Sequence, residues 1–266
     1  MSRSRSFALL VFLAVLAGAC RRKHIAVGSV PEIPYPTCDG APLPAGEVVA
    51  TQHMRPGPTS LDPNVDERYE LRHRGCVYVA TVRQAWPLGT AAAEVVFDEN
   101  LLPLRAWRRT TIPGSRRADG DADIRRYELR TPEVTIKRRG PEGVTYEILR
   151  GPRPRAVIGP GRGLLTAWIR RAHLRVGERL REPVLDFREI VERLQEVTLR
   201  READLFVPWL GHAARVYTIY GREPVFADET DAVIGDLAGM RPDSTLSTTR
   251  PAAMPLYSAP DPQHTP

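Results

Sequence analysis

The stretch from Cys76 to Arg108 decides the fold; it reads CVYVATVRQAWPLGTAAAEVVFDENLLPLRAWR. In its first part Val77, Val79 and Thr81 alternate with Tyr78, Ala80 and Val82. The β-rich run 93–97 follows and ends in the turn-forming residues 98–100, and residues 104–108 alternate again. Short alternating runs joined by tight turns are typical of half-buried antiparallel strands. This stretch therefore predicts a β-meander.

The same pattern continues along the chain. Further strands are expected at Arg125–Leu129, Val134–Lys137, Val144–Leu149, Glu182–Phe187 and Ala214–Gly221. Pro-Gly, Asp-Gly, Thr-Pro and Gly-Pro pairs punctuate the series, as turns require. The region Val191–Arg201 fits either a helix or a strand. We predict a mainly β (α+β) fold, with a single antiparallel, curved sheet or half-barrel and one or two packing helices.

One helix is expected at Leu164–Arg175, with Gly177 as its stop signal. Its apolar stripe faces one side, as in amphipathic helices, and comprises Leu164, Leu165, Trp168, Ile169 and Ala172. The stripe has two interpretations. It either packs on the sheet as core, or it covers an apolar-ligand cavity as a lid.

The chain has 266 residues, of which 42% are hydrophobic and 26% charged, as in ordinary globular proteins. Proline-rich segments flank the middle of the chain. We divide it into a signal peptide (1–19), a tether (20–45), a β-rich globular domain (46–240) and a disordered tail (241–266). The net charge of +6 comes almost entirely from scattered arginines. Without a basic patch interleaved with aromatics, the sequence predicts no nucleic-acid partner.

The N-terminus carries Arg3 and Arg5, then an apolar run from Phe7 to Ala19 directly before Cys20. The run is too short for a spanning helix and has the length of a signal h-region. It resembles a bacterial lipoprotein signal peptide with its lipobox. The resemblance implies that Cys20 is acylated with diacylglycerol and fatty acid and anchors the protein to a membrane in the cell envelope. Arg21, in place of aspartate, favours the outer membrane. Secretion without a lipid is the alternative.

Lipidation of Cys20 would leave Cys38 and Cys76 as an even pair in an oxidising compartment. We expect them to form a disulfide that pins the N-terminal arm to the sheet. The alternative is two unpaired buried thiols.

No motif for catalysis, phosphate binding or metal binding emerges from the remaining residues, and we predict no cofactor and no metal. Gly159-Pro160-Gly161-Arg162-Gly163 lacks the lysine of a phosphate loop. Asp119-Gly120-Asp121-Ala122-Asp123 begins like a calcium loop, but Arg130 stands where a glutamate is needed. The cluster Asp228, Glu229 and Asp231 suits acid–base chemistry or a charged loop. The four residues 181–184 recur as 222–225, a repeat short enough to arise by chance.

The order of tether, meander, helix Leu164–Arg175, Gly177 and further strands resembles periplasmic proteins with a LolA-like half-barrel. The resemblance covers roughly residues 46–240 and implies a curved sheet closed by helices around a cavity for acyl chains. No motif matches residue for residue, so no functional residues carry over. Two function classes follow: a non-catalytic envelope lipoprotein that binds an apolar ligand or an envelope partner or serves a structural role, and a cell-envelope hydrolase without a recognisable motif.

Overall fold

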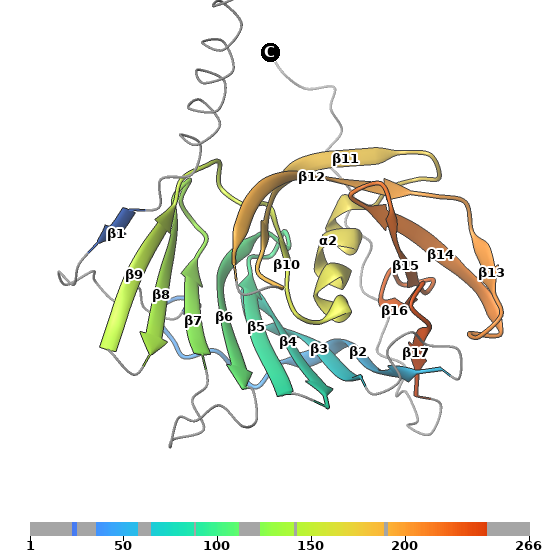
Figure 1. Ribbon diagram of the computed structural model, residues 1–266, viewed down its shortest axis with the longest axis horizontal. Coiled ribbons are helices and arrows are strands. Elements are labelled where there is room, and N and C mark those ends of the chain that lie inside the picture. Colours follow the sequence, from blue (N-terminus) through green and yellow to red (C-terminus); the bar gives the residue numbers. More distant parts are fainter. Residues whose placement is uncertain are drawn as a thin grey trace, which may run out of the picture.

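The computed structural model describes residues 23–25, 36–57, 65–87, 89–111, 123–140, 143–188 and 191–243. Cys20, the predicted signal peptide and Asp119–Ala122 lie outside these ranges. Within them, strands form two sheets, and a single α-helix lies between the sheets (Figure 1). The predicted mainly β fold with an antiparallel, curved sheet is confirmed, and the second sheet adds a curled half-barrel to it.

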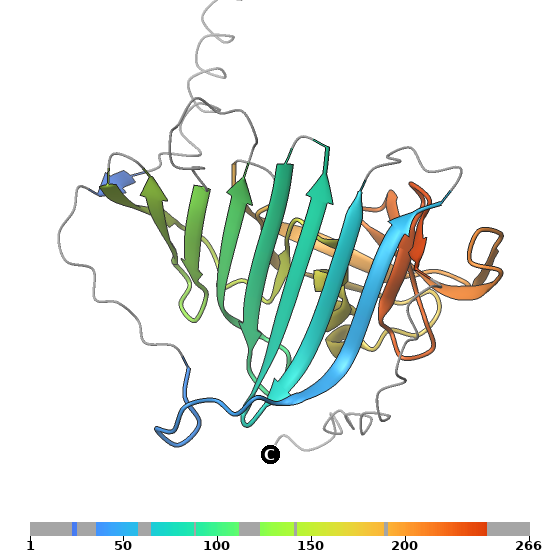
Figure 2. The same cartoon turned by 90° about the horizontal axis from the view of Figure 1, so that it is seen from below.

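The large sheet has ten strands in the order β1-β9-β8-β7-β6-β5-β4-β3-β2-β17, all paired antiparallel. Its strands are β1 (Lys23–Ile25), β2 (Glu47–Pro56), β3 (Asp66–Arg74), β4 (Val77–Trp86), β5 (Gly89–Phe97), β6 (Pro103–Thr111), β7 (Asp123–Glu128), β8 (Val134–Gly140), β9 (Gly143–Leu149) and β17 (Met240–Pro242). Strands β2 to β9 follow one another in space as in sequence, and Figure 2 shows them as one broad sheet.

Alternation explains which face of this sheet is buried. On β4, the side chains of Ala80 and Val82 are buried in the central core, together with Tyr69 of β3 and Val95 of β5. Residues one position away point to the opposite face, because side chains alternate along a strand. There Val79 and its neighbours form a smaller cluster against Leu43. The end of the predicted tether therefore lies on the domain, and β1 likewise pairs with β9.

The second sheet contains β10 (Ala156–Ile158), β11 (Arg179–Asp186), β12 (Arg193–Arg201), β14 (His212–Ile219), β15 (Glu223–Ala227) and β16 (Val233–Asp236), with β13 (Leu205–Val207) paired to β14. Figure 1 shows this sheet curling around the helix. Strands β10 and β11 run parallel, and the other pairs are antiparallel. The ambiguous region Val191–Arg201 is a strand from Arg193 onward, because residues 193–200 pair along the whole length of β11.

The helix consists of a 3₁₀ turn, η1 (Arg162–Leu164), followed by α2 (Leu165–Ala172). Leu164 and Ala167 are buried in the core of the large sheet. Leu165, Trp168 and Ile169 belong to a second core cluster with residues of the curled sheet. The expected stop at Gly177 is corrected, since His173 adopts a left-handed conformation (φ 44°) and ends the helix earlier.

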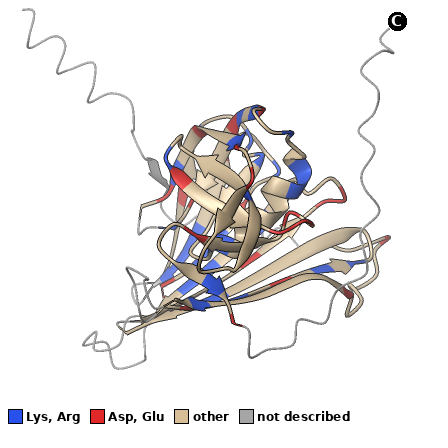
Figure 3. Ribbon diagram, turned by 90° about the vertical axis from the view of Figure 1, so that its right-hand side faces the viewer, with Lys and Arg blue, Asp and Glu red and all other residues tan. Residues whose placement is uncertain are grey.

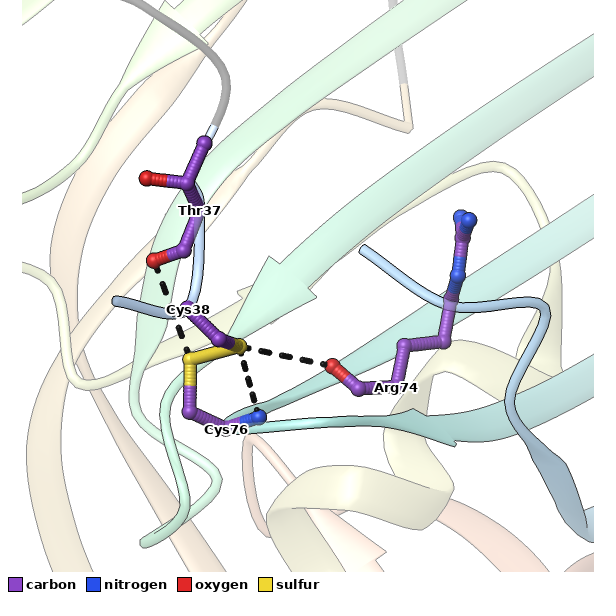
Figure 4. The surroundings of a disulfide bond; sticks show 4 residues. All are labelled: Thr37, Cys38, Arg74 and Cys76. Atoms are coloured by element: carbon purple, nitrogen blue, oxygen red, sulfur yellow. Dashed lines mark hydrogen bonds between the residues drawn. A yellow bond between two sulfur atoms is a disulfide. The ribbon is translucent and has the colours of Figure 1, made fainter. Parts of the chain in front are cut away.

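Cys38 and Cys76 form a disulfide with their Cα atoms 5.6 Å apart, which confirms the predicted pair (Figure 4). Cys76 lies directly before β4, and Cys38 belongs to the N-terminal arm. The Arg74 side chain donates hydrogen bonds to the backbone carbonyl oxygens of Leu43 and Pro44 in the same arm. The disulfide and these bonds hold the arm against one end of the sheet.

The C-terminal end of the described chain completes the large sheet. Strand β17 pairs with the last residues of β2, so the predicted tail loses Arg241 and Pro242 to the sheet. The backbone N–H of Asp243 donates to the carbonyl oxygen of His53 (2.7 Å), and the Asp243 carboxylate lies 3.3 Å from Nδ1 of the same histidine. Asp66 contacts the other ring nitrogen of His53 at 2.9 Å. Residues 244–266 lie outside the described residues.

Candidate functional site

Two adjoining pockets form a groove beside the helix, where the curled sheet meets the large sheet. The first, of about 380 Å³, we call the apolar pocket; its apolar wall consists of Ile158, Pro160, Leu165, Ile219, Val225 and Leu237. The second, of about 340 Å³, we call the arginine pocket; it is lined by Asp186, Arg188, Arg193, Gln195, Tyr220 and Arg222, among others. Arg188, Arg222 and Glu223 line both pockets, so the two volumes are continuous. Each lies at the lower end of the sizes typical of ligand pockets.

The glycine-rich segment Gly159–Gly163 forms one wall of the apolar pocket, and its close packing explains why it is rich in glycine. A side chain on Gly161 would collide with Val82 of β4, and one on Gly163 would collide with the ring of Tyr69 on β3. Glycine is the residue that allows such a close backbone approach. This segment therefore has a packing role, and it sets Arg162 at the border between the two sheets.

Arg162 holds a buried charge cluster beneath this wall. Its guanidinium pairs with Asp236 of β16 and lies 3.5 Å from the carboxylate of Glu67 on β3. Glu67 is fully buried and also accepts a hydrogen bond from the backbone N–H of Gly163 (2.8 Å). Burial raises the pKa of Glu67, although the charge of Arg162 and the Gly163 hydrogen bond act against that rise. Two carboxylates thus share one guanidinium, and the cluster joins β3, the helix start and β16.

We expect Glu67→Gln to gain stability relative to the wild type as the pH rises. The raised pKa means that the folded state binds the Glu67 proton more tightly than the unfolded state does. Its contribution is therefore complete below the ordinary pKa of 4.5 and is lost as the pH rises through the folded pKa. Glutamine keeps an acceptor for Gly163 and carries no charge. Urea unfolding between about pH 4 and about pH 8 measures the difference.

Glu67→Ala serves as the contrast to this variant. It leaves the buried N–H of Gly163 without its acceptor, which costs about 1–3 kcal/mol at any pH. A Glu67→Gln protein that loses stability relative to the wild type as the pH rises would contradict the raised pKa of Glu67.

The arginine pocket is organised around Arg188. Its guanidinium donates to Asp186 Oδ2 and to Glu223 Oε2, both at 2.9 Å, and lies 5.7 Å above the ring of Tyr220. The Tyr220 hydroxyl donates to Asp186 (2.8 Å) and accepts from the side chain of Gln195 (2.9 Å). Burial and the Asp186 contact raise the pKa of Tyr220 to about 12, so its hydroxyl stays protonated at neutral pH. Arg188 is therefore a positioning residue whose charge is already balanced.

Arg222 differs from Arg188 because its guanidinium has no ion pair or hydrogen bond with any of the described residues. It is the last residue of the turn between β14 and β15, in which Tyr220 (φ 54°) and Gly221 (φ 71°) both have positive φ angles. The backbone N–H of Arg222 closes the turn on the carbonyl oxygen of Ile219. A positive φ is unfavourable for a bulky residue such as tyrosine, and the Asp186 and Gln195 contacts hold Tyr220 in it. The turn thus places the Arg222 guanidinium, which has no ion pair among the described residues, where the two pockets meet.

The predicted site residues are partly brought together here. Of the apolar stripe, Leu165 lines the apolar pocket, whereas Leu164, Trp168 and Ile169 face the cores of the two sheets. Cys20 lies outside the described residues. Cys38, on the N-terminal arm, and Cys76, directly before β4, do not line the groove.

The acidic cluster does not converge on the groove. Asp228 caps the turn between β15 and β16 by accepting from the backbone N–H groups of Thr230 (2.8 Å) and Ala232 (3.0 Å). Asp231 accepts from the Tyr217 hydroxyl (2.8 Å) and pairs with Arg215. Both carboxylates therefore have structural partners.

Sequence reasoning missed Arg188 and Arg222 as groove residues. Arginines occur throughout this chain, so neither stands out. The repeat of 181–184 at 222–225 was the one signal: in the second copy Arg222, Glu223, Pro224 and Val225 all line the apolar pocket. In the first copy Glu182 is buried and pairs with Arg155 and Arg171 instead.

The described residues contain no group of three or more His, Cys, Asp or Glu side chains that could hold a metal ion. Among the same residues, no helix has the length and apolarity needed to cross a membrane. Basic and acidic residues are interspersed over the end of the molecule seen in Figure 3.

No family model matches the chain, and no curated protein matches it. Among solved structures, it is similar to the crystal structure of a DUF1089 family protein from Pseudomonas aeruginosa, with 14% sequence identity and a TM-score of 0.44. The match covers 68% of this chain and 92% of that chain. At these values it supports no statement about function. The fold and groove define the class directly: a two-sheet β protein with a central helix and an amphipathic groove.

Proposed function

We propose that this protein is an envelope-anchored lipoprotein with a non-catalytic role, and that it binds an apolar ligand in the apolar pocket. The wall of that pocket carries the proposal, because six apolar side chains line it, beside five charged residues. Ligand pockets typically combine an apolar lining with a small number of polar groups that orient the ligand. The volume suits one hydrocarbon chain better than a lipid with two.

The composition of the groove favours binding over hydrolysis. A hydrolase would need a nucleophile and a base in contact, with a third group to orient the base. The described residues that line the two pockets include no serine, cysteine or histidine. The carboxylates of Asp186, Glu223 and Asp236 are paired with arginines.

Binding of a neutral fluorescent probe tests this role. We expect N-phenyl-1-naphthylamine to bind the chain from residue 20 onward carrying Cys20→Ala, with a fluorescence increase and one site per chain. Ala238→Trp should weaken binding at least about tenfold, or about 1.4 kcal/mol, because Ala238 lines the pocket and the indole fills it. Ala203→Trp, on an exposed loop outside the pocket, is the matched control. Equal binding of the probe by both tryptophan variants, or no binding by the Cys20→Ala protein without either tryptophan, would refute the ligand role.

The anchor rests on Cys20 and the apolar run before it. We expect the wild-type protein to partition into detergent and to carry three acyl chains on Cys20, since two or more chains give stable anchoring. Cys20→Ala should leave the protein in the aqueous phase. Mass spectrometry that finds an unmodified N-terminal residue in the wild type would contradict the lipoprotein assignment.

A further inference from the structure

The groove changes character along its length. Six apolar side chains line the apolar pocket, beside Arg162, Asp236 and the three charged residues that both pockets share. The arginine pocket is lined mainly by polar groups, with three guanidinium groups and two carboxylates from Arg188, Arg193, Arg222, Asp186 and Glu223. Arg188 is held by both of those carboxylates. Arg193 lines only the arginine pocket, so the remaining positive charge where the two pockets meet is that of Arg222.

The turn that carries Arg222 is held by contacts from two strands. The Tyr220–Gly221 turn is fastened to β11 through Asp186 and to β12 through Gln195, at 2.8 and 2.9 Å from the Tyr220 hydroxyl. Backbone conformations of this kind cluster at functional sites, where the surrounding structure maintains them. Held in this way, Arg222 faces both volumes without a partner among the described residues.

We propose that Arg222 binds the anionic headgroup of a single-chain amphiphile whose hydrocarbon chain occupies the apolar pocket. A guanidinium can donate two parallel hydrogen bonds to a carboxylate or a phosphate, and this geometry favours both groups over a neutral alcohol. The ligand class is therefore a fatty acid or a monoacyl phosphate. This inference rests on the proposed ligand role of the apolar pocket.

Competition with paired ligands tests the headgroup assignment. We expect dodecanoate to displace N-phenyl-1-naphthylamine at a concentration at least about tenfold lower than dodecanol, a preference of about 1.4 kcal/mol. Arg222→Ala should remove that preference, because it should weaken dodecanoate binding much more than dodecanol binding. Arg179→Ala, which removes an exposed arginine that does not line either pocket, should behave as the wild type. Raising the ionic strength should reduce the difference in affinity between dodecanoate and dodecanol, because an exposed charge is screened by salt.

The outcomes distinguish a failure of the headgroup assignment from a failure of the proposed ligand binding. Probe binding that is blocked by Ala238→Trp, with equal affinities for dodecanoate and dodecanol, would overturn the headgroup assignment alone. Inorganic phosphate is the second arm, titrated by calorimetry into the wild type and Arg222→Ala. If phosphate alone binds through Arg222 as tightly as dodecyl phosphate does, the site is one for a free anion and the amphiphile assignment fails. Tighter binding of dodecyl phosphate than of phosphate supports it.

Discussion

Trp168→Ala is expected to destabilise the protein by about 3–5 kcal/mol, the range for truncating a large aromatic side chain in a core. Trp168 is 2% exposed and lies in the cluster that joins α2 to the curled sheet. The neighbouring Leu164 and Ala167 bind the same helix to the large sheet, so a cavity at this position weakens the junction of both layers. For a domain of this size the melting temperature should fall by roughly 10 °C.

Trp168→Phe separates packing from hydrogen bonding. The indole N–H of Trp168 is buried and has no partner among the described residues, so phenylalanine removes an unpaired donor while keeping most of the ring. We expect this variant to lose less than about half as much stability as the alanine variant. Val176→Ala, at a side chain that is 61% exposed, should be nearly neutral. A loss below about 1 kcal/mol in Trp168→Ala would indicate the lid over a cavity in place of a packing helix.

The double variant Cys38→Ala/Cys76→Ala should lose up to about 4 kcal/mol of stability. The disulfide closes a loop with a sequence separation of 38 residues. In the chain-entropy model, removing a cross-link across a loop of that length raises the conformational entropy of the unfolded chain. This stabilises the unfolded state by about 4 kcal/mol. The N-terminal arm should be cleaved faster by a protease, because the disulfide and the Arg74 hydrogen bonds both hold it.

A reducing agent provides the control for this variant. Dithiothreitol should lower the melting temperature of the wild type toward that of the double variant, and should leave the double variant unchanged. Unfolding at the same temperature in all four samples would mean that the arm and the sheet are held together without the disulfide.

The meander was predictable because its information is local. In Cys76–Arg108 each strand alternates and each break carries turn residues, so period and punctuation agree. The disulfide followed from counting cysteines. The apolar stripe could also be predicted, since Leu164, Leu165, Trp168 and Ile169 recur at helical spacing. The spacing does not show that the two sides of the stripe face different sheets.

The division into two sheets and the groove could not be read in this way. Whether β10 pairs with β9 or with β11 depends on contacts between residues far apart in sequence. The same holds for Arg222, whose importance comes from lying beside two pockets and from a turn held by Asp186 and Gln195. The helix boundary failed for a different reason, since His173 takes up a left-handed conformation that sequence patterns assign more readily to Gly177.

The pairing of β17 with β2 also orders the events of folding. Among the described strands, β2 is the second in sequence and β17 the last, so their residues lie far apart along the chain. Neighbouring strands from β2 to β9 are adjacent in sequence and can pair early, whereas Met54–Pro56 at the end of β2 gain their partner only from Met240–Pro242. Contacts between such distant segments form slowly, and an open edge strand invites pairing with other chains until they do. We therefore expect this end of the sheet to be the last part of it to form, when Asp243 docks on His53.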